Sequence, residues 1–173
     1  MAGRGRASLG REATGRHPLA MRTIRASRLV AASRDRVWAL YDDIANTPSW
    51  VPFSEEILYL SGPTGVGTVY RERTRLGGVA DVGEWEITHY DPPRRQVHYS
   101  RDKRMDSTLI ITMLEAGDRT YLTQVVVLES RLPGVLGWLH ERIVSIVGAK
   151  GIGSAVAAAK GQFEPAEALT FAI

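Results

Sequence analysis

The chain has 173 residues, which suits one domain, and it has no cysteine, which excludes disulfides, thiolate nucleophiles and cysteine-ligated metals. Its net charge of +3 lies in residues 1–20, and the rest of the chain carries 18 basic and 18 acidic side chains. The folded part therefore gives no electrostatic argument for nucleic-acid binding.

The first twenty residues are rich in arginine and lack the apolar run of a secretory signal. We predict a disordered basic extension over 1–20, a single domain over 21–165 and a short tail over 166–173. The sequence leaves open whether the extension belongs to the native protein. Because no run of 18 apolar residues occurs, we predict no integral membrane association. Arginine outnumbers lysine 19 to 3, a bias typical of GC-rich bacteria, and we expect a cytoplasmic location.

The domain begins with a strand over 22–32 that leads into Ser33, a residue favoured at helix N-caps. A short helix follows over about 34–42, and a second covers about 43–47 before Pro48 ends regular structure. Two short helices are therefore expected directly after the first strand.

The middle of the chain reads as six consecutive strands separated by turn residues such as Gly77-Gly78 and Pro92-Pro93. Short connections make neighbouring strands antiparallel. The predicted strands cover about 54–61, 66–75, 79–90, 95–101, 106–115 and 119–131.

After Pro133 the apolar residues recur at spacings near 3.6, which predicts a long amphipathic helix over 134–163. Three glycines, Gly148, Gly151 and Gly153, interrupt the pattern and would permit a kink or a close approach to the sheet. An α+β fold follows: a curved seven-stranded antiparallel sheet wraps around the long C-terminal helix, with the two short helices closing one end. Such a sheet leaves a hollow beside the helix.

The sequence resembles the START-like, or SRPBCC, superfamily over about residues 22–165. Segments that carry the resemblance are 32–38 (ASRDRVW), 42–52 (DDIANTPSWVP), Gly65-x-Gly67, and 85–95 with Trp85-Glu86-Ile87 and the DPPRR turn. The resemblance implies a helix-grip fold with a hydrophobic cavity. It does not imply a reaction, because members of one fold differ in what the cavity contains.

A two-residue turn at Gly77-Gly78 would pair Tyr70 with Trp85, and alternation then sorts the hairpin into two faces. One face carries the charges Arg71, Arg73, Glu84 and Glu86 and reads as solvated. The other should face the helix and the hollow; it carries Tyr70, Glu72, Thr74, Asp81, Trp85, Ile87 and His89.

On the next strand, Val97, Tyr99 and Arg101 alternate with Gln96, His98 and Ser100. We predict the first set to face inward because it is more apolar, which requires a bulge near Pro92-Pro93. Arg101 could equally lie exposed in a basic turn with Lys103 and Arg104.

These faces give the predicted ligand-binding residues: Tyr70, Glu72, Trp85, Ile87, His89, Val97, Tyr99, Leu139, Ile143 and Val147. Any catalysis would rest on weaker candidates, Glu72 with Tyr99 or Arg101. No metal site is predicted, since His89, His98 and His140 have no common spacing, and no cofactor is expected.

The favoured function is the binding, and in some settings transport, of a small hydrophobic molecule such as a lipid, polyketide or isoprenoid. An alternative is an enzyme that resembles polyketide aromatase/cyclases, in which the cavity folds a reactive chain. A further alternative is a protein-interaction module, which predicts a filled interior and an exposed apolar patch. The sequence leaves the oligomeric state open, a homodimer included.

Overall fold

The computed structural model describes residues 21–164, without the side chain of Glu141. The predicted extension over 1–20 and tail over 166–173 lie outside the described residues. The predicted order of one strand, two short helices, six strands and a long helix is confirmed. The elements are β1 (Met21–Val30), α1 (Arg34–Asp42), η1 (Ile44–Ser49), β2 (Ser54–Leu60), β3 (Val69–Leu76), β4 (Val79–Asp91), β5 (Arg95–Arg101), β6 (Met105–Ala116), β7 (Arg119–Ser130) and α2 (Gly134–Gly161).

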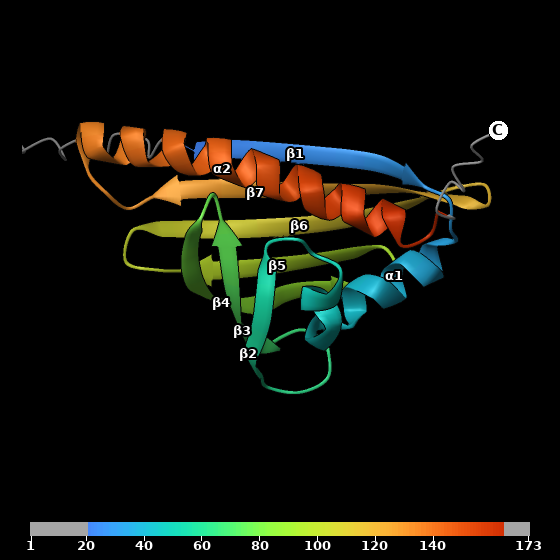
Figure 1. Cartoon of the computed structure of the whole chain (residues 1–173). Helices are drawn as coiled ribbons and strands as arrows, with labels where there is room; N and C mark the ends of the chain where they lie inside the picture. The colour runs from blue at the N-terminus through green and yellow to red at the C-terminus, as the bar shows by residue number, and fades with distance from the viewer. Residues whose placement is uncertain (1–20, 165–173) are drawn as a thin grey trace, which may run out of the picture.

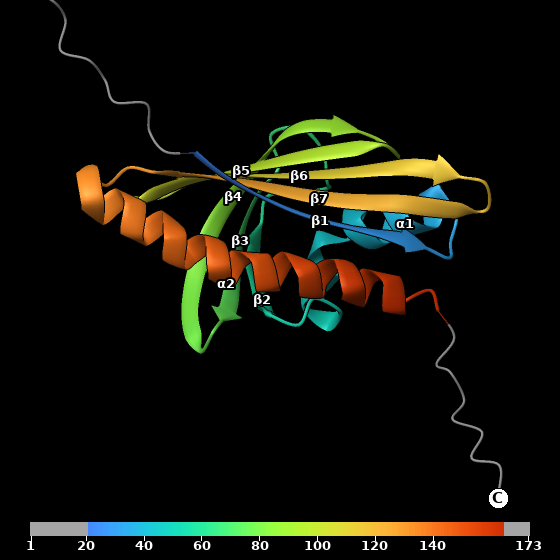
Figure 2. The same ribbon diagram turned by 90° about the horizontal axis from the view of Figure 1, so that it is seen from above.

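Seven strands form one antiparallel sheet in the order β1-β7-β6-β5-β4-β3-β2. Figure 1 shows β1, β7 and β6 running along α2, whereas β4, β3 and β2 turn across that direction, so the sheet curves around the helix. The two short elements α1 and η1 lie at one end of the concave face, near the C-terminal half of α2 (Figure 2). This is the helix-grip arrangement expected from the sequence.

The turn between β3 and β4 fixes the register on which the site depends. Gly77 and Gly78 have φ of +58° and +84°, a left-handed conformation that glycine adopts without strain. The turn pairs Leu76 with Val79 and Tyr70 with Trp85, as the sequence predicts. The strand itself starts at Val69 rather than 66, because Thr68 stays in the preceding loop, where its hydroxyl donates to the Pro63 carbonyl at 2.7 Å.

The main core lies between the second half of α2 and strands β1, β6 and β7. Ile152, Val156 and Ala159 of α2 are buried there together with Met113 and Leu122 of the sheet. A smaller cluster of Ile44, Tyr70 and Ile87 lies under η1. Side chains of both clusters line the space between them but do not fill it.

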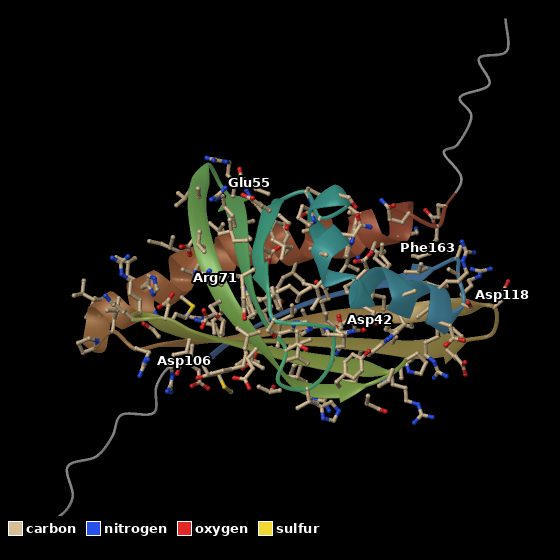
Figure 3. The ribbon with its side chains drawn as sticks, turned by 90° about the horizontal axis from the view of Figure 1, so that it is seen from below. Asp42, Glu55, Arg71, Asp106, Asp118 and Phe163 are labelled. Atoms are coloured by element: carbon tan, nitrogen blue, oxygen red, sulfur yellow. The ribbon has the colours of Figure 1, made fainter. Side chains whose placement is uncertain are left out.

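The short helix α1 is held to the sheet by its buried face and by its last residue. Val37, Trp38 and Tyr41 are buried, and Tyr90 on β4 donates a hydrogen bond to the Asp42 carboxylate at 2.7 Å (Asp42 is labelled in Figure 3). Ser33 occupies the N-cap position as predicted, although its hydroxyl makes no capping hydrogen bond. The element after α1 is a 3-10 helix that runs through Pro48.

Two of the predicted interrupting glycines let α2 approach the sheet closely, and the helix continues through them. A Cβ atom on Gly148 would lie 3.1 Å from Ile24 Cδ1, and one on Gly151 would lie 3.0 Å from Leu76 Cδ2. Among the described residues, α2 is the one helix that is long and apolar enough to cross a membrane. The core helices of soluble proteins also meet this criterion. Its second half is packed against the sheet.

Alanine substitutions at two other glycines of α2 should have opposite effects on stability. A Cβ on Gly137 would overlap the Leu132 carbonyl oxygen, so Gly137→Ala should destabilise the fold by about 1–3 kcal/mol. A Cβ on Gly153 would meet nothing within 4 Å, so Gly153→Ala should stabilise it by up to about 1 kcal/mol through helix propensity. Chemical denaturation of both variants measures the difference, and equal shifts would contradict the packing at Gly137.

Candidate functional site: a cavity between helix and sheet

A cavity of about 510 Å³ lies between α2 and the concave face of the sheet. Its size falls within the range of about 300–1,000 Å³ typical of small-molecule sites. Most of its wall is apolar. The apolar side chains that line it are Ile24, Ile44, Val51, Phe53, Leu76, Val82, Met105, Leu109, Ile111, Val126, Leu128, Val144, Ile152 and Ala155.

The lining is exposed at one end of the cavity and buried at the other. Val82, Glu84 and Arg101 are exposed, whereas Trp50 and Ala155 are buried. Val82 and Glu84 lie on β4, whose turn with β3 approaches Val147 midway along α2, and Arg101 lies at the end of β5, next to the β5–β6 turn that contacts Arg131 just before α2. We therefore place the mouth at the end where α2 begins, which is also the end where Figure 3 shows Asp106, opposite Asp118 and Phe163.

The hairpin face predicted to look inward lines the cavity as far as Trp85. Tyr70, Glu72 and Trp85 are lining residues, as are Thr74 and Asp81 nearer the turn. Ile87 is fully buried, but it belongs to the small cluster under η1 and is not part of the cavity wall.

A bulge reverses the faces beyond this point and corrects the prediction for His89, Val97 and Tyr99. The register shifts between Ile87, which pairs with His98, and His89, which pairs with Val97. The bulge thus lies within β4, not near Pro92-Pro93 as expected. His89 is exposed, and Val97 and Tyr99 lie outside the cavity wall. On β5, Gln96 and His98 are the inward residues, with exposed fractions of 0% and 3%.

The inward residues of β5 join Tyr70 in a buried chain of hydrogen bonds. Tyr70 Oη lies 2.9 Å from His98 Nδ1, and His98 Nε2 lies 3.0 Å from Gln96 Oε1. Because the Gln96 oxygen can only accept, Nε2 carries the proton, and Nδ1 is left to accept from the Tyr70 hydroxyl. Burial lowers the pKa of His98 to about 4, so its imidazole is neutral near pH 7.

Glu72 is the acidic group beside this chain. Burial raises its pKa, and a nearby Ser54 hydroxyl offsets part of that shift. Burial also raises the pKa of Tyr70, and the Glu72 charge adds to the effect. The pair therefore favours a protonated phenol and an unusually basic carboxylate on the cavity wall.

Further polar groups face the cavity from α1, η1 and the sheet. Gln124 donates to the Tyr41 hydroxyl at 2.9 Å, which links β7 to α1. The Trp50 indole N–H and His140 Nδ1 are buried without a hydrogen-bond partner among the described residues. Both belong to lining residues and could bind a polar group of a ligand.

The face of α2 toward the cavity differs from the predicted one. Leu139 and Ile143 are 46% and 55% exposed, and Val147 packs near the hairpin turn at Gly77 without lining the cavity. The lining residues are His140, Val144, Gly148, Gly151, Ile152 and Ala155. The spacing of apolar residues near 3.6 predicted the helix correctly. It did not identify the face that lines the cavity, because α2 has apolar residues on both faces.

Of the catalytic candidates, only Glu72 lies well inside. Arg101 is at the exposed mouth, where it pairs with Asp106 at 3.2 Å, and Tyr99 borders a shallow hollow on the other face of the sheet. Glu72 with Tyr99 or Arg101 is thus not a convergent set. Within residues 21–164, no group of three or more His, Asp or Glu side chains could hold a metal ion.

Comparison with known proteins agrees with this architecture. A family model described as polyketide cyclase / dehydrase and lipid transport matches residues 21–164. No curated protein sequence matches the chain.

Solved structures of the same fold include the Zhui aromatase/cyclase from Streptomyces sp. R1128, with 18% identity and a TM-score of 0.73 over 83% of this chain and 93% of that one. A START superfamily protein from Mycobacterium smegmatis has 16% identity and a TM-score of 0.65 over 82% and 96%. The ginseng major latex-like protein 151 from Panax ginseng has 12% identity and a TM-score of 0.63 over 84% and 99%. At these identities the likeness concerns the fold. The chain belongs to the polyketide cyclase / dehydrase and lipid transport family, within the START-like superfamily.

Proposed function

We propose that the protein binds, and in its setting carries, a small and largely apolar molecule inside the cavity. The observation that carries this proposal is the cavity of about 510 Å³ with a mostly apolar wall and one exposed end. Removing apolar ligand surface from water there would contribute roughly 25 cal/mol per Å². An open interior also argues against the interaction-module alternative, which expects a filled one.

The polar groups of the wall support a ligand with one or two oxygen atoms along an apolar frame. The unpartnered Trp50 N–H can donate to a ligand carbonyl or hydroxyl group, and the Tyr70 oxygen and the Glu72 carboxylate can accept from a ligand hydroxyl group. Such groups would orient the ligand while apolar contact supplies most of the affinity.

The test is native mass spectrometry of the purified full chain, followed by organic extraction. We expect a bound mass that is released into the extract as a lipid, polyketide or isoprenoid. Protein that stays free of added mass after incubation with representatives of all three classes would contradict the proposal.

A second function, cyclisation or dehydration of a polyketide, is favoured by the hydrogen-bonded pair of Tyr70 and His98. A ring closure between carbonyl groups needs a base that takes a proton from the attacking carbon and an acid that protonates the accepting carbonyl oxygen. Glu72 could serve as the base and the Tyr70 hydroxyl as the acid, provided that the hydroxyl turns its proton from His98 Nδ1 to the carbonyl oxygen; the proton taken up by Glu72 then returns to the Tyr70 oxygen. The product of closure would then lose water to become aromatic.

Removing the Tyr70 hydroxyl should separate catalysis from binding. Tyr70→Phe should lower turnover of a poly-β-ketone substrate by about 10²–10³-fold, while its affinity changes by only a few-fold, because the ring stays in place. The matched control is Tyr99→Phe, which lies outside the cavity wall and should behave as the parent. Equal turnover of the parent and Tyr70→Phe, as measured by absorbance of the aromatic product, would rule out this assignment.

A further inference from the structure

The outward face of the first half of α2 carries an apolar stripe without a partner among the described residues. We call the outer stripe the set Val135, Leu136, Trp138, Leu139, Ile143 and Ile146, whose exposed fractions run from 46% to 78%. Isolated apolar residues are normal on a surface, but a contiguous set of this kind marks an interaction site.

The outer stripe lies on the side of the helix opposite the cavity. His140 and Val144, which line the cavity, come from the other face of the same turns. A helix that packs on a sheet needs only one apolar face. The second apolar face of α2 therefore suits a second apolar environment, outside the fold.

The outer stripe also lies at the mouth of the cavity. The first turns of α2 project beyond the end of the sheet (Figures 1 and 2). Arg101, an exposed residue of the cavity wall, lies at this end, where it pairs with Asp106. Whatever covers the outer stripe is therefore next to the ligand's entrance.

Basic side chains flank the outer stripe on the helix. The Arg142 guanidinium lies 5.6 Å from the centre of the Trp138 ring, and Lys150 is exposed about two turns further on. A helix with tryptophan and aliphatic residues on one face and basic residues beside them is typical of helices that lie in a membrane interface.

Further basic residues lie at the same end, on the β5–β6 turn and just before α2. The Arg131 backbone N–H donates to the Arg104 carbonyl at 2.7 Å, which places the turn beside the start of the helix. The Asp102 carboxylate is engaged within that turn by the backbone N–H groups of Arg104 and Met105. In the described part of the chain, Lys103 and Arg104 form no ion pair.

We propose that the outer stripe docks on an anionic lipid surface, with the first half of α2 lying in the plane of the membrane interface. The apolar side chains would enter the acyl boundary and the basic residues would contact lipid phosphates. A second copy of the chain fits less well, because a two-fold contact centred on Ile143 would bring the two Arg142 side chains together. Docking places the cavity mouth at the membrane. Passage of the ligand between the membrane and the cavity rests on the proposed function.

The test measures sedimentation of the full chain with vesicles of phosphatidylcholine alone or with about one-third phosphatidylglycerol. We expect binding to the anionic vesicles, weakened by salt. The variant Leu139→Gln with Ile143→Gln should lower the partition coefficient about tenfold, since both side chains are exposed and their loss leaves the fold intact. The control, Ala157→Gln, adds the same group at an exposed position of α2 about three turns beyond the outer stripe and should bind within about twofold of the parent.

Lys103→Gln with Arg104→Gln should reduce the preference for anionic vesicles without changing binding to neutral ones. Absence of binding to both vesicles would overturn the docking proposal, and so would a dimer in sedimentation analysis that the Leu139/Ile143 variant dissociates. Vesicle binding is scored without ligand. A failed extraction would therefore overturn the proposed function alone, and failed sedimentation would overturn the docking alone.

Discussion

Replacing Ala155 by phenylalanine is expected to lower the affinity of the cavity for an apolar probe by about 70-fold and to leave the chain folded. Ala155 is buried on α2 and lines the inner end of the cavity, opposite the sheet. A phenyl ring there that displaces about 100 Å² of ligand contact removes about 2.5 kcal/mol at 25 cal/mol per Å², which is the stated loss. The neutral fluorophore N-phenyl-1-naphthylamine, whose emission rises in an apolar site, gives the affinity.

The matched control is Ala157→Phe, which adds the same ring at an exposed position of the same helix. It should bind the probe as the parent does. Val126→Phe, which enters the cavity from β7, is a second occluding variant and guards against local misfolding at Ala155. If both occluding variants retained parental affinity and gave folded spectra, the probe would bind elsewhere, and the cavity would not be the ligand site.

The fold was predictable from the sequence because its signals are local. Turn residues such as Gly77-Gly78 separate the strands, and the register they imply, with Tyr70 opposite Trp85, is the one found. The boundaries of α1 and β5 also agree with the prediction. Resemblance to a known superfamily pointed to the same architecture, so the two lines of inference agreed.

The site was predictable only up to the bulge in β4. Tyr70, Glu72 and Trp85 precede the bulge and line the cavity. After the bulge, which residues face inward depends on the register shift between Ile87 and His89, and no residue type at that position predicts the shift. Choosing the more apolar set on β5 then excluded Gln96 and His98, because hydropathy does not reveal that two polar side chains will form a hydrogen bond with each other in the interior. The alternation of side chains along β5 was the available signal, and it is equally compatible with Gln96 and His98 facing inward.

The error on α2 has a different cause. Periodicity identifies an apolar stripe but not which of two stripes faces the sheet, and here Leu139 and Ile143 belong to the outward one. Gly148 and Gly151 mark the inward side, because only a missing Cβ permits the contacts with Ile24 and Leu76. Orienting the helix with Gly148 and Gly151 toward the sheet also places His140 and Val144 on the cavity wall.

Lowering the pH from about 6.5 to 4 should destabilise the protein by about 3 kcal/mol through His98 alone. In the folded state burial holds the pKa of His98 at about 4, against 6.5 for the ordinary side chain. Between these values the unfolded chain binds the proton and the folded chain does not, so the free energy of unfolding rises with pH. The contribution is complete above pH 6.5 and is lost as the pH falls toward 4.

Glu72 opposes this trend over part of the range. Burial raises its pKa, so the folded chain takes up a proton at higher pH than the unfolded chain does, and acidification stabilises the fold through this group. The effect of His98 is therefore read as a difference between variants. His98→Asn keeps an acceptor near the Tyr70 hydroxyl but cannot become charged, and its free energy of unfolding should depend less steeply on pH in this range than that of the parent.

The control His89→Asn replaces the exposed histidine of β4 and should keep the parental slope. Urea denaturation at several pH values between 4 and 6.5 supplies the free energies for all three proteins. Equal slopes for the parent and His98→Asn would mean that His98 is solvated in the folded chain. The buried hydrogen bond between Tyr70 and His98 would then be absent, and the acid–base assignment for cyclisation would lose its structural basis, whereas the binding proposal, which rests on the apolar wall, would stand.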